Sequence, residues 1–78
     1  MEWKLEAYSD GDSKVPWHVF RCKSVDAART RATQLRRSAS EGQPNDNVWF
    51  RIMDPVGFPH QYTQPSTNWR LKWFWSKN

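Results

Sequence analysis

The residues whose types could perform chemistry are few and lie far apart in this chain. It has two histidines and one cysteine, and His18 and Cys22 stand four positions apart in an alternating, strand-like run. An extended chain separates such positions by about 13 Å, which is too far for a cysteine–histidine catalytic pair. His60 has no second histidine or acid at metal-ligand spacing. The sequence therefore predicts no catalytic group and no metal site.

Other kinds of catalytic centre are excluded in the same way. Asp10 and Asp12 flank Gly11, where turn-forming residues are expected, so they are not read as a catalytic carboxylate pair. The chain's three glycines are isolated from one another, so no glycine-rich loop can cradle a phosphate. We expect a protein that is not an enzyme and that carries no cofactor.

Positive charge is concentrated in two stretches of the chain. Twelve basic and eight acidic residues give a net charge of +4. Residues 21–37 hold six of the basic residues and one acidic residue, and residues 69–78 hold three basic residues and no acidic one. Such clustering can steer an anionic partner towards one face of a protein.

The local patterns predict which elements position these residues. Period-two alternation predicts strands over residues 2–8, 17–23 and 48–53, and turn formers over 9–13 predict a hairpin between the first two. Residues 54–57 predict a tight turn. We expect residues 58–68 to form an extended loop with at most a short strand over 60–63, and residues 69–76 to form a final strand.

A helix is expected between the second and third strands. Ser24 suits the N-cap, and Gly42 suits the end of the helix. The core stripe of this helix should consist of Val25, Ala28, Ala32, Leu35 and Ala39. The chain is thus predicted to be one α+β domain over residues 1–78, a small antiparallel sheet with one helix packed on one face (β-β-α-β plus a C-terminal strand).

The alternation also predicts an outward face of the sheet that carries tryptophan and basic residues. Charged residues at alternate positions argue that this set faces solvent, and its members are Trp17, Arg21, Lys23, Trp49 and Arg51. Aromatic rings of this kind stack with nucleobases while cations hold phosphates. The alternative is that Trp17 covers an edge of the core.

The helix carries four arginines and no lysine. At about 100° per residue, Arg29, Arg36 and Arg37 fall on one flank and Arg31 on the other. Arginine suits planar recognition of phosphate or carboxylate, so the flank is a candidate binding surface. The alternative is a solvated helix face.

In the C-terminal run, tryptophan and leucine at positions 69, 71, 73 and 75 alternate with Arg70, Lys72, Phe74 and Ser76. Its tryptophans either complete the core or form a docking edge, whose members would be Trp69, Arg70, Lys72, Trp73 and Trp75.

The order of elements resembles that of a known family. A hairpin, a Ser-x-Asp-Ala helix start and a third strand make the chain similar to small phage-encoded inhibitors of bacterial RNA polymerase of the T7 type. The similarity covers residues 2–53 and is carried by Trp3, Pro16, Ser24, Asp26, Ala27, Ala28 and the strand Val48–Met53. It implies a small regulator that binds a host enzyme through a charged surface, and it assigns no binding residue.

Three functional hypotheses follow. The first is a regulatory protein that binds nucleic acid through its basic, tryptophan-bearing face, with Arg29, Arg36 and Arg37 contacting phosphates and Trp17 and Trp49 stacking on bases. The second is an inhibitor or modulator of a protein such as RNA polymerase, whose acidic residues would meet the same arginines. The third is an assembly subunit that uses the C-terminal strand. One cysteine permits no disulfide within the chain, and no apolar run reaches the roughly 18–20 residues of a membrane span, so we expect a cytoplasmic protein that does not enter the membrane.

Overall fold

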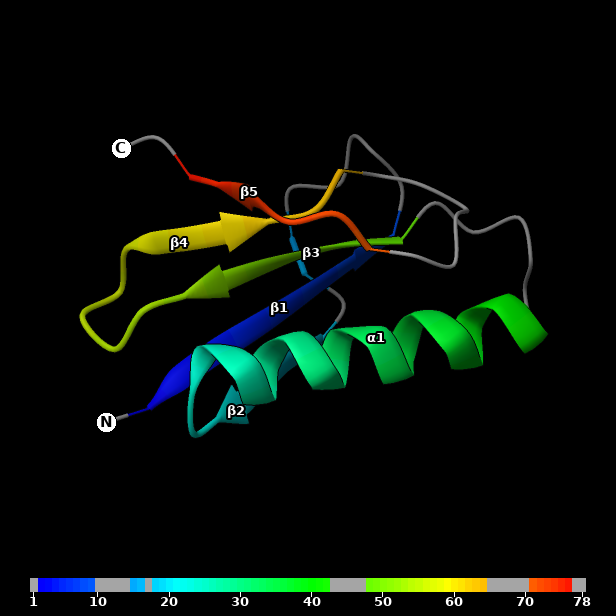
Figure 1. The fold of residues 1–78 in the computed structure, drawn as a ribbon, viewed down its shortest axis with the longest axis horizontal. Helices are drawn as coiled ribbons and strands as arrows, with labels where there is room; N and C mark the ends of the chain where they lie inside the picture. The colour runs from blue at the N-terminus through cyan, green and yellow to red at the C-terminus, as the bar shows by residue number, and fades with distance from the viewer. Residues whose placement is uncertain (1, 10–14, 17, 43–47, 65–70, 77–78) are drawn as a thin grey trace.

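The computed structural model shows one helix packed against a five-stranded antiparallel sheet (Figure 1), which confirms the predicted α+β class. It describes residues 2–9, 15–16, 18–42, 48–64 and 71–76. The elements in chain order are β1 (Trp3–Ser9), β2 (His18–Cys22), α1 (Val25–Gly42), β3 (Val48–Met53), β4 (Pro59–Tyr62) and β5 (Phe74–Trp75).

The sheet has the order β2-β1-β3-β4-β5, so β2 and β5 are its two edges. The predicted hairpin is confirmed, because β1 pairs antiparallel with β2 and Leu5 lies opposite Phe20. On its other side β1 pairs antiparallel with β3, where Leu5 lies opposite Ile52. β1 is therefore held on both sides, whereas the outer edge of β2 pairs with no strand in the described part of the chain.

The turn between β3 and β4 is held by one aspartate. Asp54 Oδ1 accepts hydrogen bonds from the backbone N–H groups of Val56, Gly57 and Phe58, at 3.0, 2.8 and 2.8 Å. The Asp54 carbonyl also accepts a bond from Gly57 N–H at 3.0 Å, so the turn expected over residues 54–57 is confirmed. Gly57 has a φ of 106°, a conformation that favours glycine.

After this turn, the sequence predicted an extended loop with at most a short strand over residues 60–63. The structure has that short strand one residue earlier: residues 59–62 form β4 against β3, with a register shift between Ile52 and Met53. Proline is tolerated at the first position of a strand, which is where Pro59 stands. In the expected final strand over residues 69–76, strand structure covers Phe74–Trp75, while residues 69 and 70 lie outside the described part.

Helix α1 begins as expected. The Ser24 hydroxyl oxygen accepts a hydrogen bond from Ala27 N–H at 3.1 Å, and its carbonyl accepts one from Ala28 N–H at 3.0 Å. Ser24 is therefore the N-cap, and it satisfies donors of the first turn that have no partner within a helix. The helix ends at Gly42, as predicted.

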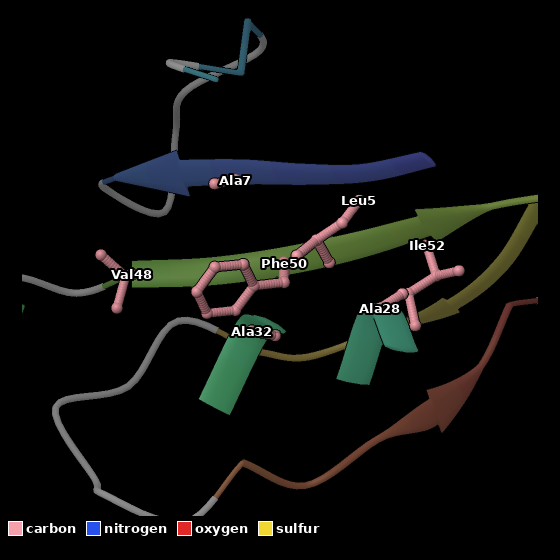
Figure 2. Close-up of a cluster of buried hydrophobic side chains, with 7 residues drawn as sticks. All are labelled: Leu5, Ala7, Ala28, Ala32, Val48, Phe50 and Ile52. Carbon is pink, nitrogen blue, oxygen red and sulfur yellow. The ribbon is translucent and has the colours of Figure 1, made fainter. Parts of the chain in front are cut away.

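The core lies between α1 and the sheet. In Figure 2, Ala28 and Ala32 of the helix lie beside Phe50 and Ile52 of β3. Alanine lets the helix backbone approach the sheet closely, and the fully enclosed apolar set is Leu5, Ala7, Ala28, Ala32, Val48, Phe50 and Ile52. Partly buried side chains pack around this cluster, and they are Trp3, Phe20, Cys22, Val25, Leu35, Leu71 and Trp73. The predicted helix stripe is confirmed at Val25, Ala28, Ala32 and Leu35, while the Ala39 side chain lies outside the described part.

Candidate binding surfaces

The two faces of the sheet differ in what covers them. Helix α1 packs on β1, β2 and β3 from one side (Figure 1), and no described helix or strand covers the other side, here called the open face. Cα partners in neighbouring antiparallel strands share a face, so the pairing assigns residues to the open face without ambiguity. Its members include Lys4, Glu6, Tyr8, Val19, Arg21, Trp49, Arg51, Tyr62 and Phe74.

A hydrogen-bonded network organises the open face over β1 and β3. Arg51 Nε donates to Glu6 Oε1 at 2.7 Å, and Arg51 Nη2 donates to the Tyr8 hydroxyl at 3.0 Å. The Tyr8 hydroxyl donates in turn to Glu6 Oε1 at 3.0 Å. Trp49 stacks on the Tyr8 ring, with 4.0 Å between ring centroids and 11° between planes. Tyr8 is thereby 2 % exposed, and the Trp49 indole is held in one orientation.

In this network the pKa values of Tyr8 and Arg51 are both raised. Burial raises the pKa of Tyr8, and its hydrogen bond to Glu6 raises it further. For Arg51, burial alone would lower the pKa, but the hydrogen bond and charge of Glu6 outweigh burial and the pKa is raised. At neutral pH the open face therefore holds a neutral phenol beside a guanidinium cation that already contacts a carboxylate.

A second group of rings extends the open face over β4 and β5. Tyr62 and Phe74 stack at 5.6 Å between centroids, and Lys72 Nζ lies 5.3 Å from the Phe74 centroid. A shallow hollow of about 510 Å³ runs beside these rings, lined by Trp49, Arg51, Pro59, Tyr62, Trp75 and Ser76. Flat aromatic surfaces beside cations are suited to stacking with planar rings of a ligand.

The predicted arginine flank of the helix is wrong at one position. Arg36 is 0 % exposed and therefore cannot present its guanidinium to a partner on the helix surface. It stands four residues after Ala32, one turn further along the buried stripe, which places it at the border of the core. Arg37 is exposed as expected.

Arg29 is half-buried and faces the sheet. Its Nε and Nη2 atoms donate to Gln61 Oε1 at 2.9 and 2.6 Å. Gln61 lies opposite the core residue Ile52, so this contact is on the helix side of the sheet. Arg29 and Arg37 therefore lie on the opposite side of the sheet from Trp49, and the structure divides the predicted basic, tryptophan-bearing surface into two.

A separate groove lies between β2 and the first half of α1. It has a volume of about 360 Å³ and is lined by Arg21, Cys22, Lys23, Ala27, Thr30, Arg31 and Gln34. The Arg31 guanidinium lies over the Phe20 ring, 5.3 Å from its centroid. Burial raises the pKa of Cys22, although the Arg31 charge acts in the opposite direction. This β2–α1 groove has three cationic residues and no acidic residue in its lining.

The predicted docking edge is also divided. Trp73 packs against the core, as the first interpretation of the C-terminal run expected. Trp75 is 70 % exposed and contacts the His60 ring edge-on at 5.1 Å. Lys72 is exposed, whereas Trp69 and Arg70, like Trp17 of the predicted outward face, lie outside the described residues.

Sequence reasoning missed several residues of these surfaces. Tyr8 was placed in the first strand but not in the candidate site, although the alternation puts it on the same face as Glu6. The sequence could not show that Tyr62 and Phe74 lie on the same face as Arg51, because that arrangement depends on how β4 and β5 pair with the other strands. Arg31 was assigned to the other flank of the helix, and that flank is the one that lines the groove.

The described residues contain no group of three or more His, Cys, Asp or Glu side chains placed to hold a metal ion. Within the same ranges, no helix has both the length and the apolar character needed to cross a bilayer. The chain matches no family model, no curated protein and no solved structure.

Proposed function

We propose that this chain is a non-enzymatic regulatory protein of the cytoplasm that binds single-stranded nucleic acid on the open face of its sheet. The observation that carries the proposal is the row of half-buried rings on that face, Trp49, Tyr62 and Phe74, with cations beside them. Arg51 lies next to the first two rings and Lys72 next to the third.

The energetics of stacking support this assignment. A base stacked on an aromatic side chain contributes about 1–3 kcal/mol, and this contribution depends little on base identity. The Trp49 indole is held by Tyr8, so little conformational entropy is lost when a base stacks on it. The rings lie on one face of a sheet, and unstacked bases of a single strand can stack on such a surface more readily than the paired bases of a duplex.

In this proposal, cations of the open face contact the phosphates of the bound strand. Lys72 is exposed, and Arg21 is exposed while its Nε lies 3.2 Å from Glu2 Oε1. Ion pairs between exposed side chains are weak, about 0–1 kcal/mol, so a phosphate can compete with Glu2 for Arg21. The predicted phosphate contact from Arg36 is not part of this proposal, because that side chain is buried.

Fluorescence anisotropy of labelled oligonucleotides tests the proposal directly. Single-stranded oligonucleotides should bind more tightly than duplexes of the same sequence, and binding should weaken between roughly 50 and 200 mM salt. Trp49→Ala should weaken single-strand binding by roughly 5- to 150-fold, the equivalent of one stacked base, while Trp49→Phe should retain most of the affinity.

Two variants that remove the same charge from opposite sides provide the control. Lys72→Gln should reduce the salt dependence by about 0.7 in slope, the value for one phosphate contact with a single strand. Arg37→Gln should leave the slope unchanged, because Arg37 lies on the helix side. Equal effects of the two variants would show that net charge alone drives binding. Absence of binding at low salt would contradict the proposal, and a pull-down for a protein target would then be the next experiment.

A further inference from the structure

The outer edge of β2, an edge strand of the described sheet, is a place where another strand can pair. β2 is the first strand in the sheet order, and nothing in the described ranges pairs with its outer side. The strand is largely open to solvent: His18, Val19 and Arg21 are exposed, and Phe20 is half-buried. An edge strand presents a row of N–H and C=O groups that a further strand can satisfy.

The β2–α1 groove adjoins the C-terminal end of this strand, where Arg21 and Cys22 line it, and it is positively charged. Arg21, Lys23 and Arg31 line it together with Thr30 and Gln34, which are neutral hydrogen-bonding residues. Arg31 rests on the Phe20 ring, so its guanidinium is held at the groove in the absence of a partner. An incoming strand would place alternate side chains towards this groove.

We infer that the β2 edge and the β2–α1 groove bind an extended acidic segment of a partner protein as an added strand. The backbone of the segment pairs with β2. Glu or Asp side chains at alternate positions meet the groove cations Arg21, Lys23 and Arg31, and the intervening side chains point away from the groove. The inference uses different contacts from the ring row of the open face, although Arg21 borders both surfaces, so its tests use an acidic peptide and Arg31, which the nucleic-acid proposal does not involve.

Two other occupants fit the observations less well. A second copy of this chain paired through β2 would bring Arg21, Lys23 and Arg31 of both copies to one seam, with no acidic residue in the groove lining to offset them. A nucleic-acid backbone offers phosphate acceptors but few donors, so it would leave the carbonyl groups of the β2 edge without partners. An acidic peptide satisfies both the charges and the backbone.

The probe is a fluorescein-labelled peptide of about seven residues in which Glu alternates with Val or Thr, long enough to span β2. Its anisotropy is titrated with the full chain, beside a peptide with Gln at each Glu position. We expect the acidic peptide to bind at least about tenfold more tightly than the Gln peptide, with a difference that shrinks as salt is raised. Equal binding of the two peptides would overturn the inference.

Charge reversal at one of two arginines of helix α1 tests whether the peptide binds in the groove. Arg31→Glu should weaken binding of the acidic peptide by about tenfold or more, whereas Arg37→Glu, an exposed helix arginine outside the groove, should change it less than about twofold. Circular dichroism checks that both variants fold. Equal losses in both variants would contradict the groove assignment.

Main-chain pairing is tested on the probe itself. N-methylation of alternate peptide residues, on the register that faces β2, should abolish binding, while methylation of the other register should not. Hydrogen exchange should show new protection of the β2 amides in the complex. Insensitivity to both methylation patterns would overturn strand addition. Protection of the same amides by an oligonucleotide, or by concentration-dependent dimerisation without peptide, would assign the edge to those occupants instead.

Discussion

The open face and the β2–α1 groove both combine arginine with an aromatic ring, but their cations are in different states. On the open face, Arg51 donates to Glu6 at 2.7 Å and to the Tyr8 hydroxyl. In the groove, Arg31 lies over Phe20, and the lining residues provide no carboxylate. Arg51 therefore already contacts a carboxylate within the fold, whereas the residues that line the groove around Arg31 include no acidic residue.

The difference shows that density of arginine in a sequence does not by itself mark a binding surface. An arginine that already has a carboxylate within the fold can orient rings and contributes little net charge to a ligand. An arginine whose nearest described contact is a ring keeps its full charge for an incoming anion. Accordingly, stacking is proposed for the rings of the open face, with Lys72 and Arg21 contacting phosphates, and binding of an acidic peptide is proposed for the groove.

The largest expected effect comes from breaking the open-face network. Glu6→Ala leaves the half-buried Arg51 and the Tyr8 hydroxyl without their shared acceptor, and it should lower the free energy of unfolding by about 1–3 kcal/mol in urea denaturation. Asp26→Ala is the control, because Asp26 is almost fully exposed and lies 4.0 Å from Arg29. It should change stability by less than about 1 kcal/mol. Equal effects would mean that the Glu6 network contributes no more than a surface pair.

A smaller effect on stability is expected from a substitution in the groove. Arg31→Gln removes the contact with Phe20 and should lower the free energy of unfolding by about 0.5–1 kcal/mol, the range for an exposed cation–π pair. Arg37→Gln should change it by less than about 0.5 kcal/mol. A destabilisation by Arg31→Gln as large as that of Glu6→Ala would show that Arg31, too, is primarily a structural residue.

Both regions should contribute to the alkaline pH dependence of stability. The pKa values of Cys22 and Tyr8 are raised above their ordinary values of 9.0 and 10.0, mainly by burial. The folded state therefore retains protons that the unfolded state loses, so stability should be complete below each ordinary pKa and fall as the pH rises through the folded pKa.

Urea denaturation between about pH 8 and about pH 11 measures this decline. Cys22→Ala should flatten its lower part, and Tyr8→Phe its upper part. Absorbance at about 295 nm in a Tyr62→Phe background reports the ionisation of Tyr8 alone, since the chain has two tyrosines. A Tyr8 titration at the ordinary value would contradict the environment described for the open face.

The smallest expected effect is the change that one bound ligand causes in the affinity for the other ligand. If the open face binds oligonucleotide and the groove binds acidic peptide, saturation with one should change the affinity for the other by less than about twofold, apart from a salt-sensitive electrostatic contribution. Anisotropy titrations of each labelled ligand in the presence of the other measure this. Full competition would show that the two regions form one site.

The fold was largely predictable because its signals are local. The period-two alternation of residues 48–53 places Val48, Phe50 and Ile52 in the core, and the structure confirms this. The N-cap at Ser24 and the turn at Asp54 are also local, because each depends on contacts within four residues. Strand β4 was expected at most as a short strand over residues 60–63 within a loop, because the surrounding prolines are breakers and its strand character comes from pairing with β3.

The candidate site was predictable in part. Alternation correctly placed Trp49 and Arg51 on one face, since the two faces of a strand are fixed by its own geometry. The helical wheel placed Arg36 with Arg29 and Arg37, but it could not show how far the core extends around the helix. Leu71 and Trp73, from the segment before β5, also pack on this core, and a helical wheel cannot include such contributions from outside the helix.

By itself, then, the sequence determined the element types, the N-cap, the alternating faces and the concentration of positive charge, because these follow from backbone periodicity and composition. Only the tertiary structure decided which cations remain available. Glu6 meets Arg51 across 45 positions of sequence, and Arg29 meets Gln61 across 32. Such contacts depend on strand order and helix placement. The sequence alone therefore could not show that the rings of the open face and the cationic groove are separate.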